Sequence, residues 1–338
     1  MKTRMALAAG ALLVALILSG CGDSSEEGVT NGTARAEAAK RAAMDRKLER
    51  LRSELRQGQA EARKGRERER RQASKSTAET SKPAADPTTA SASFEQMAAG
   101  LSGEVGAAIG PPGSSEAVSF GSLQSGSAWS TSKVPIALKV LADAGGPGGL
   151  STTQAEQMRA ALTLSDNDAA AALFGELEAS YGGIASASAA VGEVLREGGD
   201  TSTQISTQGR GEFSTYGQTE WALANQQRFM SSLAAGCVVG SESSRYVLGL
   251  MGEVASDSWG LGSAGRPASW KGGWGPGVDG GYLARQMGIL HLGEKEAVVT
   301  LATRPSDGQF STAEAMATAV AQWLAEQAPN YAAAPSGC

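Results

Sequence analysis

Three short motifs, in a fixed order along the chain, carry the residues that could do chemistry. They are Ser130-Thr-Ser-Lys133, Ser165-Asp-Asn167 and Lys271-Gly-Gly273. A serine hydroxyl becomes a nucleophile when a base lies beside it, and a desolvated lysine can be that base. A helix beginning at Ser130 would place Lys133 one turn later on the same face. The first motif alone fits an N-capping serine and a solvated lysine equally well, so the other two motifs decide the interpretation.

The order of the motifs resembles the S-x-x-K, S-D-N and K-T-G order of the serine β-lactamase and DD-peptidase family. The resemblance covers about residues 93–330. It implies that Ser130 is acylated by the substrate and that Lys133 helps to move its proton. It further implies that Ser165 relays a proton to the leaving nitrogen, while Asn167 holds the substrate amide and contacts the active-site lysine. By itself, the second motif could instead cap a helix that starts at Asp168.

The third motif departs from the family pattern. In the family, a lysine on this strand binds the substrate carboxylate with the help of a neighbouring Thr or Ser hydroxyl. Here that neighbour is Gly272, so the hydroxyl is absent and Lys271 is expected to bind the carboxylate without it. Arg285, on the next expected strand, is a candidate for the missing contact.

Backbone groups at the third motif survive the loss of that hydroxyl. The N–H groups of Ser130 and Trp274 are expected to form an oxyanion hole beside Gly273, and both Gly273 and Trp274 are expected to contact the substrate. Taken alone, a glycine-rich segment of this kind also fits the edge of a β-hairpin. We prefer the site interpretation because the segment follows the other two motifs in register.

One part of the family pattern has no counterpart in the sequence. The class A enzymes use a glutamate in a Glu-x-x-Leu-Asn loop to drive water onto the acyl-enzyme. The corresponding stretch, about residues 195–219, contains no such sequence. Glu197, Asp200 and Glu212 are candidates only as nearby carboxylates, and surface charge is the simpler interpretation for each. Acylation without efficient deacylation would leave a protein that binds penicillins covalently.

The sequence therefore predicts a serine acyl hydrolase of the β-lactamase type, whose substrate is a β-lactam or a cell-wall peptide. The alternative is a catalytically degenerate lipoprotein that binds penicillin or a peptidoglycan peptide without turnover. A third hypothesis makes the basic segment at 35–72 the functional part and the domain a passenger. The sequence predicts neither the natural substrate nor the oligomeric state.

The elements expected to position these motifs come from both ends of a domain at 93–338. Apolar runs predict strands at 103–109, 116–120, 267–272, 282–291 and 297–303. Helical patterns dominate from about 131 to 255, with helices at 168–178 and 221–233. Capping boxes at Thr153-x-x-Glu156 and Ser311-x-x-Glu314 are expected to open two more helices. The expected fold class is α/β (α+β): a five-stranded antiparallel sheet flanked by helices, with an inserted all-helical lobe and the site between them.

The first 20 residues read as a targeting segment. Lys2 and Arg4 precede an apolar run that is too short to span a bilayer, and the run ends in Leu18-Ser-Gly-Cys21. This ending resembles the lipobox of bacterial lipoproteins, in which the cysteine is lipidated. Membrane anchoring through Cys21, outside the cytoplasm, is the expectation. The alternative is an ordinary secretory signal with an incidental cysteine.

Residues 21–92 are expected to form a tether. Residues 35–75 carry 15 Lys and Arg against 7 Asp and Glu, whereas from Ser93 onward the counts are 12 and 23. The basic stretch at 35–72 fits a charged helical spacer, or alternatively a segment attracted to anionic lipid or wall polymers. Residues 73–92 have the composition of a disordered linker. A basic segment outside the cytoplasm makes nucleic acid an improbable partner.

The remaining cysteines and the single histidine limit the chemistry further. Cys237 and Cys338 are expected to form a disulfide in an exported chain, although two free thiols are the alternative. His291 is the only histidine, and no C-x-x-C motif occurs. A zinc site and a Ser-His-Asp triad are therefore not expected. The glycines after Lys271 lack the strand–turn–helix context of a nucleotide site, and no cofactor or metal is expected.

Overall fold

The computed structural model describes residues 87–255, 258–335 and 337–338. The expectations for the targeting segment, Cys21 and residues 35–72 lie outside these described residues. The elements follow one another in the order α2 (Pro87–Ala98), β1 (Gly103–Gly110), β2 (Val118–Gly121), η1 (Trp129–Ser132), α3 (Lys133–Ala144), η2 (Pro147–Gly149), α4 (Thr152–Thr163), α5 (Asn167–Tyr181), α6 (Ile184–Glu197), η3 (Tyr216–Gln218), α7 (Leu223–Ala234), α8 (Gly240–Met251), η4 (Gly260–Ser263), β3 (Ala268–Pro276), β4 (Tyr282–Leu292), β5 (Lys295–Pro305) and α9 (Phe310–Tyr331).

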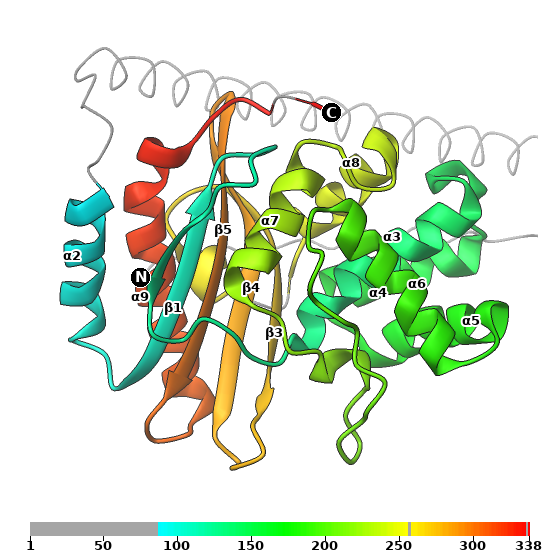
Figure 1. The fold of residues 1–338 in the computed structure, drawn as a ribbon, viewed down its shortest axis with the longest axis horizontal. Coiled ribbons are helices and arrows are strands. Elements are labelled where there is room, and N and C mark those ends of the chain that lie inside the picture. Colours follow the sequence, from blue (N-terminus) through cyan, green and yellow to red (C-terminus); the bar gives the residue numbers. More distant parts are fainter. Residues whose placement is uncertain (1–86, 256–257, 336) are drawn as a thin grey trace, which may run out of the picture. The chain divides into compact units, whose positions relative to one another are not determined.

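The five strands form one antiparallel sheet in the order β2-β1-β5-β4-β3. Strand β1, from the start of the domain, pairs along its whole length with β5, from the end, and Val105 lies opposite Thr303. Strand β3 lies at the edge, where Lys271 pairs with Met287 of β4. The prediction of one sheet built from both ends of the chain is confirmed (Figure 1).

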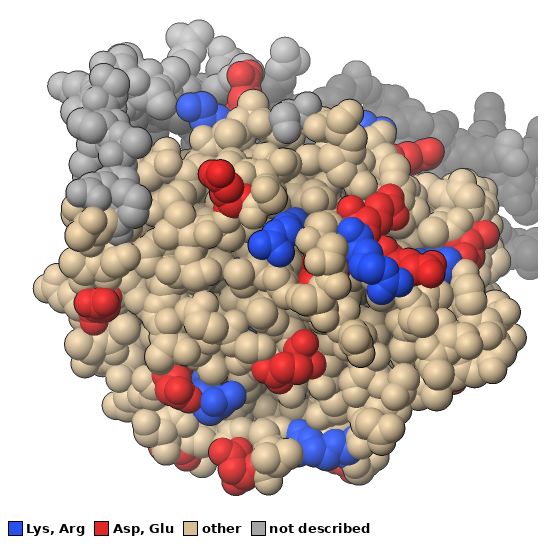
Figure 2. All heavy atoms as spheres, viewed as in Figure 1, with Lys and Arg blue, Asp and Glu red and all other residues tan. Residues whose placement is uncertain are grey.

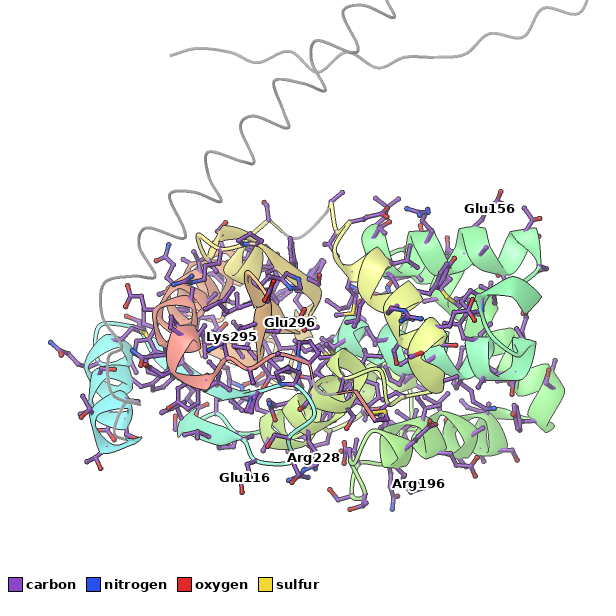
Figure 3. The ribbon with its side chains drawn as sticks, turned by 90° about the horizontal axis from the view of Figure 1, so that it is seen from above. Glu116, Glu156, Arg196, Arg228, Lys295 and Glu296 are labelled. Carbon is purple, nitrogen blue, oxygen red and sulfur yellow. A yellow bond between two sulfur atoms is a disulfide. The ribbon has the colours of Figure 1, made fainter. Side chains whose placement is uncertain are left out.

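Each face of the sheet has its own apolar core, because successive strand residues point to opposite sides. Ile109 and Leu301 pack on α9 and its Val320, with α2 packed against α9 in turn. Met287 and Ile289 point the other way, into the core of the helices between β2 and β3. Helices α3 to α8 form the expected helical lobe, and they lie on the opposite side of the sheet from α2 and α9 (Figures 1 and 3).

Neither predicted capping box is observed: the first is out of register and the second is absent. Helix α4 begins one residue before Thr153, and its capping box is formed by Ser151 and Gln154, whose side chains bond to each other's backbone N–H. Helix α9 begins at Phe310 after Gln309, without a side-chain cap. The first error is one of register only, since neighbouring S/T-x-x-E/Q patterns overlap in this Ser/Thr-rich stretch.

The folded part starts earlier than the expected boundary at residue 93. Helix α2 begins at Pro87, and its Ala90 and Phe94 are buried. The Phe94 ring contacts the rings of Phe120 and Trp323 at centroid distances of 5.6 and 4.9 Å. Composition alone missed this helix because its apolar anchors are few among Ser, Thr and Ala.

The expected disulfide is present. Cys237 and Cys338 are joined across 101 residues of sequence, with their Cα atoms 5.3 Å apart. Among the described residues, no helix is long and apolar enough to cross a membrane. The same part of the chain holds no cluster of three or more His, Cys, Asp or Glu residues suited to a metal ion. On the face shown in Figure 2, acidic and basic side chains are scattered among uncharged ones.

Candidate active site

Ser130 lies in the short 3₁₀ helix η1, which leads directly into α3. The turn begins at Trp129, whose φ of 48° lies in the left-handed region, where a side chain is strained. The Trp129 ring is buried and packs edge-on against Phe213 at a centroid distance of 5.1 Å. The predicted placement of Lys133 one turn after Ser130 is confirmed, as a 3₁₀ turn that continues into an α-helix.

Lys133 joins the first motif to the second. Lys133 is buried, with only 2% of its surface exposed. Its Nζ donates to Ser165 O at 2.6 Å, to Asn167 Oδ1 at 2.8 Å and to Asp166 O at 3.2 Å. An amino group held by several oxygen atoms in a buried position is fixed in place, as proton transfer requires. The expected contact between Asn167 and the active-site lysine is therefore present.

The second motif forms the connection between α4 and α5. Ser165 has a φ of 57°, so this connection, like the turn at Trp129, is held in a left-handed conformation. Asp166 is the N-cap of α5, and its side chain accepts a hydrogen bond from Ala169 N at 2.7 Å. The two interpretations of this motif thus apply to different residues: Asp166 caps the helix, while Ser165 and Asn167 face the lysines.

Lys271 joins the third motif to the second. Its Nζ donates to Ser165 Oγ at 2.8 Å and to Gly272 O at 2.9 Å, and the residue is completely buried. Ser165 therefore has Lys133 at its carbonyl and Lys271 at its hydroxyl. The three motifs converge, as the resemblance implies, even though Lys271 and Ser165 are 106 residues apart in sequence.

The glycines of β3 allow this strand to lie directly against η1, the turn that carries Ser130. A Cβ atom on Gly273 would be 2.8 Å from both Ala128 O and Ser130 N. A Cβ atom on Gly275 would be 2.3 Å from the Trp129 ring. The absence of side chains at these two positions is therefore a condition for bringing the Ser130 backbone next to the strand.

A cavity of about 630 Å³, here called the Ser130 cavity, opens where these elements meet. Five predicted site residues line it: Ser130, Lys133, Ser165, Asn167 and Trp274. Lys271 and Gly273 are not among its lining residues, because Lys271 lies behind Ser165 and Gly273 lies against the backbone of the nucleophile turn. The cavity lies between the helical lobe and β3, the edge strand of the sheet, as expected.

An aromatic wall of this cavity was missed by sequence reasoning. Trp129, Phe213, Tyr216 and Tyr282 line the cavity together with Trp274. They come from η1, from the segment before η3, from η3 itself and from two strands, and they share no sequence motif. Only the tertiary structure brings them together.

Arg210 links the segment before η3 to the end of β3 through hydrogen bonds. Its guanidinium donates to Gly277 O at 3.0 Å and also to Pro276 O. It lies over the rings of Phe213 and Trp129, 5.0 and 5.7 Å from their centroids. The cation therefore supports the aromatic wall.

The suggestion that Arg285 supplies an anion contact is wrong. Arg285 is completely buried outside the cavity, and it donates to Gly126 O at 2.6 Å, Trp221 O at 3.1 Å and Gln226 Oε1 at 2.7 Å. Burial lowers its pKa to about 10, so the group stays charged at neutral pH. Residue 285 pairs with Gly273 and so lies on the same face of the sheet, but its guanidinium is covered by the backbone at Gly126 and Trp221.

The three candidate carboxylates lie in different surroundings. Glu197 accepts a hydrogen bond from Val239 N at 2.8 Å, and Asp200 is buried and accepts from Trp221 Nε1 at 2.8 Å. Neither lines the Ser130 cavity. The surface interpretation is wrong for Asp200, because this residue is buried, and its role is structural. Glu212 does line the cavity. It is the one of the three that a bound substrate or water could reach.

His291 takes part in a hydrogen-bonded chain at the other end of the sheet. Its Nε2 lies 3.0 Å from Ser269 Oγ, and its Nδ1 lies 3.2 Å from Glu296 Oε1, beside the hairpin between β4 and β5. The order of groups is that of a Ser-His-acid triad. However, Ser269 is buried, and none of the three residues lines the Ser130 cavity. We therefore assign these hydrogen bonds a structural role at the hairpin.

Comparisons with known proteins agree with this architecture. No protein-family model matches the chain, and no curated protein sequence matches it. Among solved structures, a β-lactamase from Streptosporangium roseum is 15% identical, with a TM-score of 0.57 over 71% of this chain and 98% of that one. A β-lactamase from Xanthomonas campestris is 19% identical, with a TM-score of 0.56 over 71% and 98%. A reconstructed ancestral class A β-lactamase is 21% identical, with a TM-score of 0.55 over 70% and 99%. The chain therefore has the serine β-lactamase/DD-peptidase-like fold.

Proposed function

We propose that this protein is a lipid-anchored serine acyl hydrolase, acylated at Ser130 by a β-lactam or a cell-wall-peptide-like substrate. One observation carries the proposal. Lys133, the Ser165–Asn167 segment and Lys271 form one hydrogen-bonded network at the wall of the cavity that Ser130 lines. A purely structural network would not need to open onto a nucleophile. The fold likeness supports the same reaction class.

In the proposed reaction, Ser130 Oγ attacks the carbonyl carbon of an amide. The C–O bond forms and leaves a negative charge on the carbonyl oxygen, while Lys133 as a neutral amine takes the hydroxyl proton. The C–N bond then breaks as this proton passes through Ser165 to the leaving nitrogen. Water then attacks the ester, which releases a carboxylic acid and restores the serine. The N–H groups of Ser130 and Trp274 stabilise the oxyanion, where one donor contributes about 3–4 kcal/mol.

The burial of Lys271 changes the role proposed for it. The residue is completely buried behind Ser165, so we assign it to holding the Ser165 hydroxyl in position rather than to binding a carboxylate. A serine that accepts a hydrogen bond from a cation has its own proton directed elsewhere. Ser165 is then oriented to donate toward the substrate's leaving group.

Mass spectrometry of the intact protein after incubation with benzylpenicillin tests the acylation step. We expect the mass of one added penicillin, located on Ser130 by peptide mapping and absent from Ser130→Ala. Decay of the adduct over minutes would identify a hydrolase. An unmodified wild-type protein, with no turnover of any β-lactam or ester, would contradict the proposal.

The second candidate is a binding protein with slow or absent deacylation. It is favoured by Gly272, which lacks the family's hydroxyl, and by the position of Asp200, which is held away from the cavity by Trp221. A persistent adduct on Ser130 identifies covalent binding without turnover. Equal affinity of wild type and Ser130→Ala for a wall peptide, with neither form active, identifies non-covalent binding.

The membrane anchor is a separate part of the proposal and needs its own test. Incorporation of a labelled fatty acid should occur in the wild type and be lost in Cys21→Ser, which should also release the protein from membranes. Labelling that survives Cys21→Ser would contradict the assignment. The folded domain, which begins at Pro87, should keep its reactivity toward benzylpenicillin in both forms.

A further inference from the structure

The walls of the Ser130 cavity carry an excess of negative charge. Of the described residues that line it, three are charged: Lys133, Asp168 and Glu212. Lys133 is held by oxygen atoms of the protein, whereas the carboxylates of Asp168 and Glu212 are exposed. Neither carboxylate forms an ion pair with a Lys or Arg of the described chain. A ligand in this cavity therefore meets two carboxylates that a positive charge could approach.

The cationic side chains near the cavity are turned to other partners. Lys271 is buried behind Ser165, and Arg285 is buried among carbonyl groups outside the cavity. Arg210 supports the aromatic wall and donates to the backbone at the end of β3. With Gly272 in place of a hydroxyl residue, a negatively charged substituent gains little here, and it approaches the two carboxylates at a cost.

The aromatic wall supplies the rest of the recognition surface. Trp274 stacks on Phe310 at a centroid distance of 5.5 Å, and Tyr282 packs on the same ring at 5.5 Å. Trp129 is fixed by Phe213, as described above. Rings held from behind lose little conformational entropy when they contact a ligand. Such a wall favours a flat apolar group, and its π faces attract a cation.

From these observations we infer that the site prefers an acyl donor whose side chain combines an aromatic ring with a positive charge. The ring would lie on the aromatic wall, and the cation would lie toward Asp168 and Glu212. This inference rests on the proposed acylation of Ser130, because it concerns the side chain of the group transferred to that serine. It adds a substrate class within the proposed function.

Three penicillins that differ only at the carbon next to their phenyl ring provide the test. Ampicillin carries an ammonium group there, benzylpenicillin a hydrogen atom and carbenicillin a carboxylate. The three share the penicillin nucleus, so differences in acylation rate report on the side chain alone. Acylation of Ser130 would be followed by mass spectrometry at about pH 6, where the amino group is protonated. Second-order acylation constants make the comparison independent of how fast each adduct is hydrolysed.

We expect ampicillin to acylate the protein fastest and carbenicillin slowest, with a ratio of about tenfold, which is what a few exposed charge interactions supply. The ratio should fall toward one in the double variant Asp168→Asn/Glu212→Gln. It should remain at the wild-type value in Glu116→Gln, which removes one negative charge from a residue outside the cavity. Salt at about 1 M should reduce the wild-type ratio, because exposed charges are screened.

Each other outcome overturns a distinct claim. Equal rates for the three penicillins, or the reverse order, overturn the inference but leave the acylation of Ser130 intact. A ratio that persists in the double variant overturns the assignment to Asp168 and Glu212. Failure of all three compounds to modify Ser130 overturns the proposed function, and the inference with it.

Discussion

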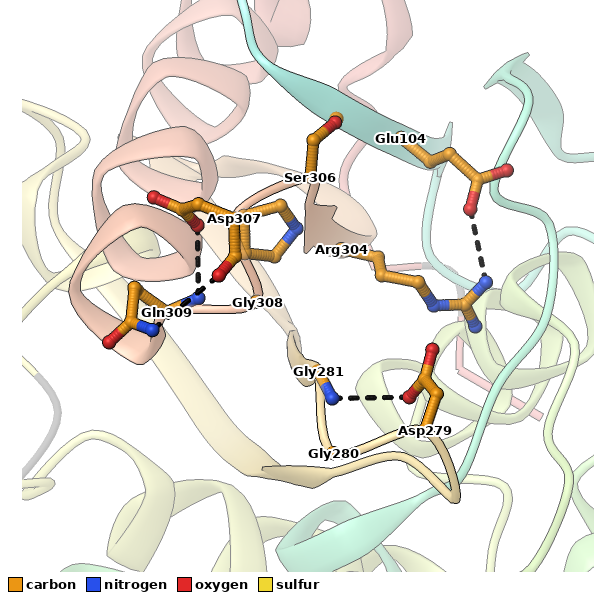
Figure 4. A pocket seen from close by; sticks show the side chains of 11 residues that line it. Glu104, Asp279, Gly280, Gly281, Arg304, Ser306, Asp307, Gly308 and Gln309 are labelled. Atoms are coloured by element: carbon orange, nitrogen blue, oxygen red, sulfur yellow. Dashed lines mark hydrogen bonds and ion pairs between the residues drawn. The ribbon is translucent and has the colours of Figure 1, made fainter.

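The protein has two hollows of similar size that are built in different ways. The Ser130 cavity has about 630 Å³, and a second hollow of about 770 Å³ lies between the turn that joins β3 to β4 and the connection from β5 to α9. We call this second hollow the turn hollow; it is lined by residues 103–104, 279–281 and 304–309 (Figure 4). The larger hollow is not the one that gathers Ser130, the lysines and the aromatic wall. Size alone therefore does not identify the site.

The difference lies in where the polar groups find their partners. In the turn hollow, Asp279 Oδ1 accepts from Gly281 N at 3.1 Å, and Asp307 Oδ1 accepts from Gln309 N at 2.9 Å. Both bonds span two residues and stabilise tight turns, which their sequences would form anywhere. In the Ser130 cavity, the bond from Lys271 to Ser165 spans 106 residues. The turn hollow also has a bond between distant residues, from Arg304 to Glu104, but it joins exposed side chains, whereas Lys271 is completely buried. A buried network beside a cavity is more readily explained by function than local turns and an exposed ion pair are.

The largest effect should come from the nucleophile. Ser130→Ala should lower the rate of substrate turnover by about 10³-fold or more, since the covalent step is lost. Ser306→Ala, in the turn hollow, should leave the rate unchanged. Steady-state kinetics with a chromogenic β-lactam or ester measures both variants. A comparable loss in both would mean that the two hollows do not differ in function.

A smaller loss is expected when the second motif is released from the third. Lys271→Met leaves the Ser165 hydroxyl without its cationic donor and should lower the acylation rate by about 10²-fold, within the range of general acid–base contributions. The matched change in the turn hollow is Arg304→Met, which removes an exposed ion pair with Glu104 of 3.0 Å. It should change neither rate nor stability measurably. If Lys271→Met acylates at the wild-type rate, Ser165 is not positioned by Lys271.

The close approach of β3 to the nucleophile turn gives a third comparison. Gly273→Ala places a Cβ atom 2.8 Å from Ala128 O and Ser130 N, both backbone atoms that cannot rotate away. We expect a destabilisation of about 1–3 kcal/mol from overpacking and a loss of activity of about tenfold or more from misplacement of the serine. Gly281→Ala, whose Cβ atom would meet its nearest neighbour at 3.6 Å, should be tolerated. Urea unfolding and acylation kinetics measure the pair, and equal stabilities would remove the steric argument.

The smallest effects concern pH, and they fall at opposite ends of the range. Burial raises the pKa of Tyr216, in the Ser130 cavity, above its ordinary value of 10.0, against the hydrogen bond with Ser214. The unfolded chain then loses this proton first, so the stabilising contribution is complete below about pH 10 and is lost as pH rises through the folded-state pKa. Tyr216→Phe should therefore flatten the decline of the melting temperature at alkaline pH.

Asp307, in the turn hollow, should affect only the acid limb. Hydrogen bonds from Gln309 N and then Thr312 Oγ1 hold its pKa below the ordinary value of 3.8. Its contribution is present above that value and is lost as pH falls through the folded-state pKa. Asp307→Asn should therefore flatten the fall of the melting temperature as pH drops below about 4, and it should leave the slope of the alkaline limb as it is. If either variant altered the pH dependence of the melting temperature at both the acid and the alkaline limit, the separation of the two hollows would be contradicted.

Motif order and strand patterns were enough to predict the central features of the domain. The five strands were found at nearly their observed positions, since alternation and short apolar runs are local signals. Ser130, Lys133, Ser165 and Asn167 were identified because their spacing along helices and turns is also local. The aromatic wall was missed because its members come from separate elements. The burial of Arg285 was missed because the segments that cover it, at Gly126 and Trp221, are distant in sequence.

Sequence by itself determined the chemical groups: a hydroxyl and an amine one helical turn apart, a turn rich in hydrogen-bonding groups, and a lysine followed by glycines. The tertiary structure decided what those groups contact. Lys271 lies behind Ser165 rather than in the cavity, Arg285 faces the protein interior, and Glu212 alone of the three candidate carboxylates reaches the site. The physical reason is that burial and direction depend on how the sheet and the helical lobe pack. Local spacing fixes neither of them.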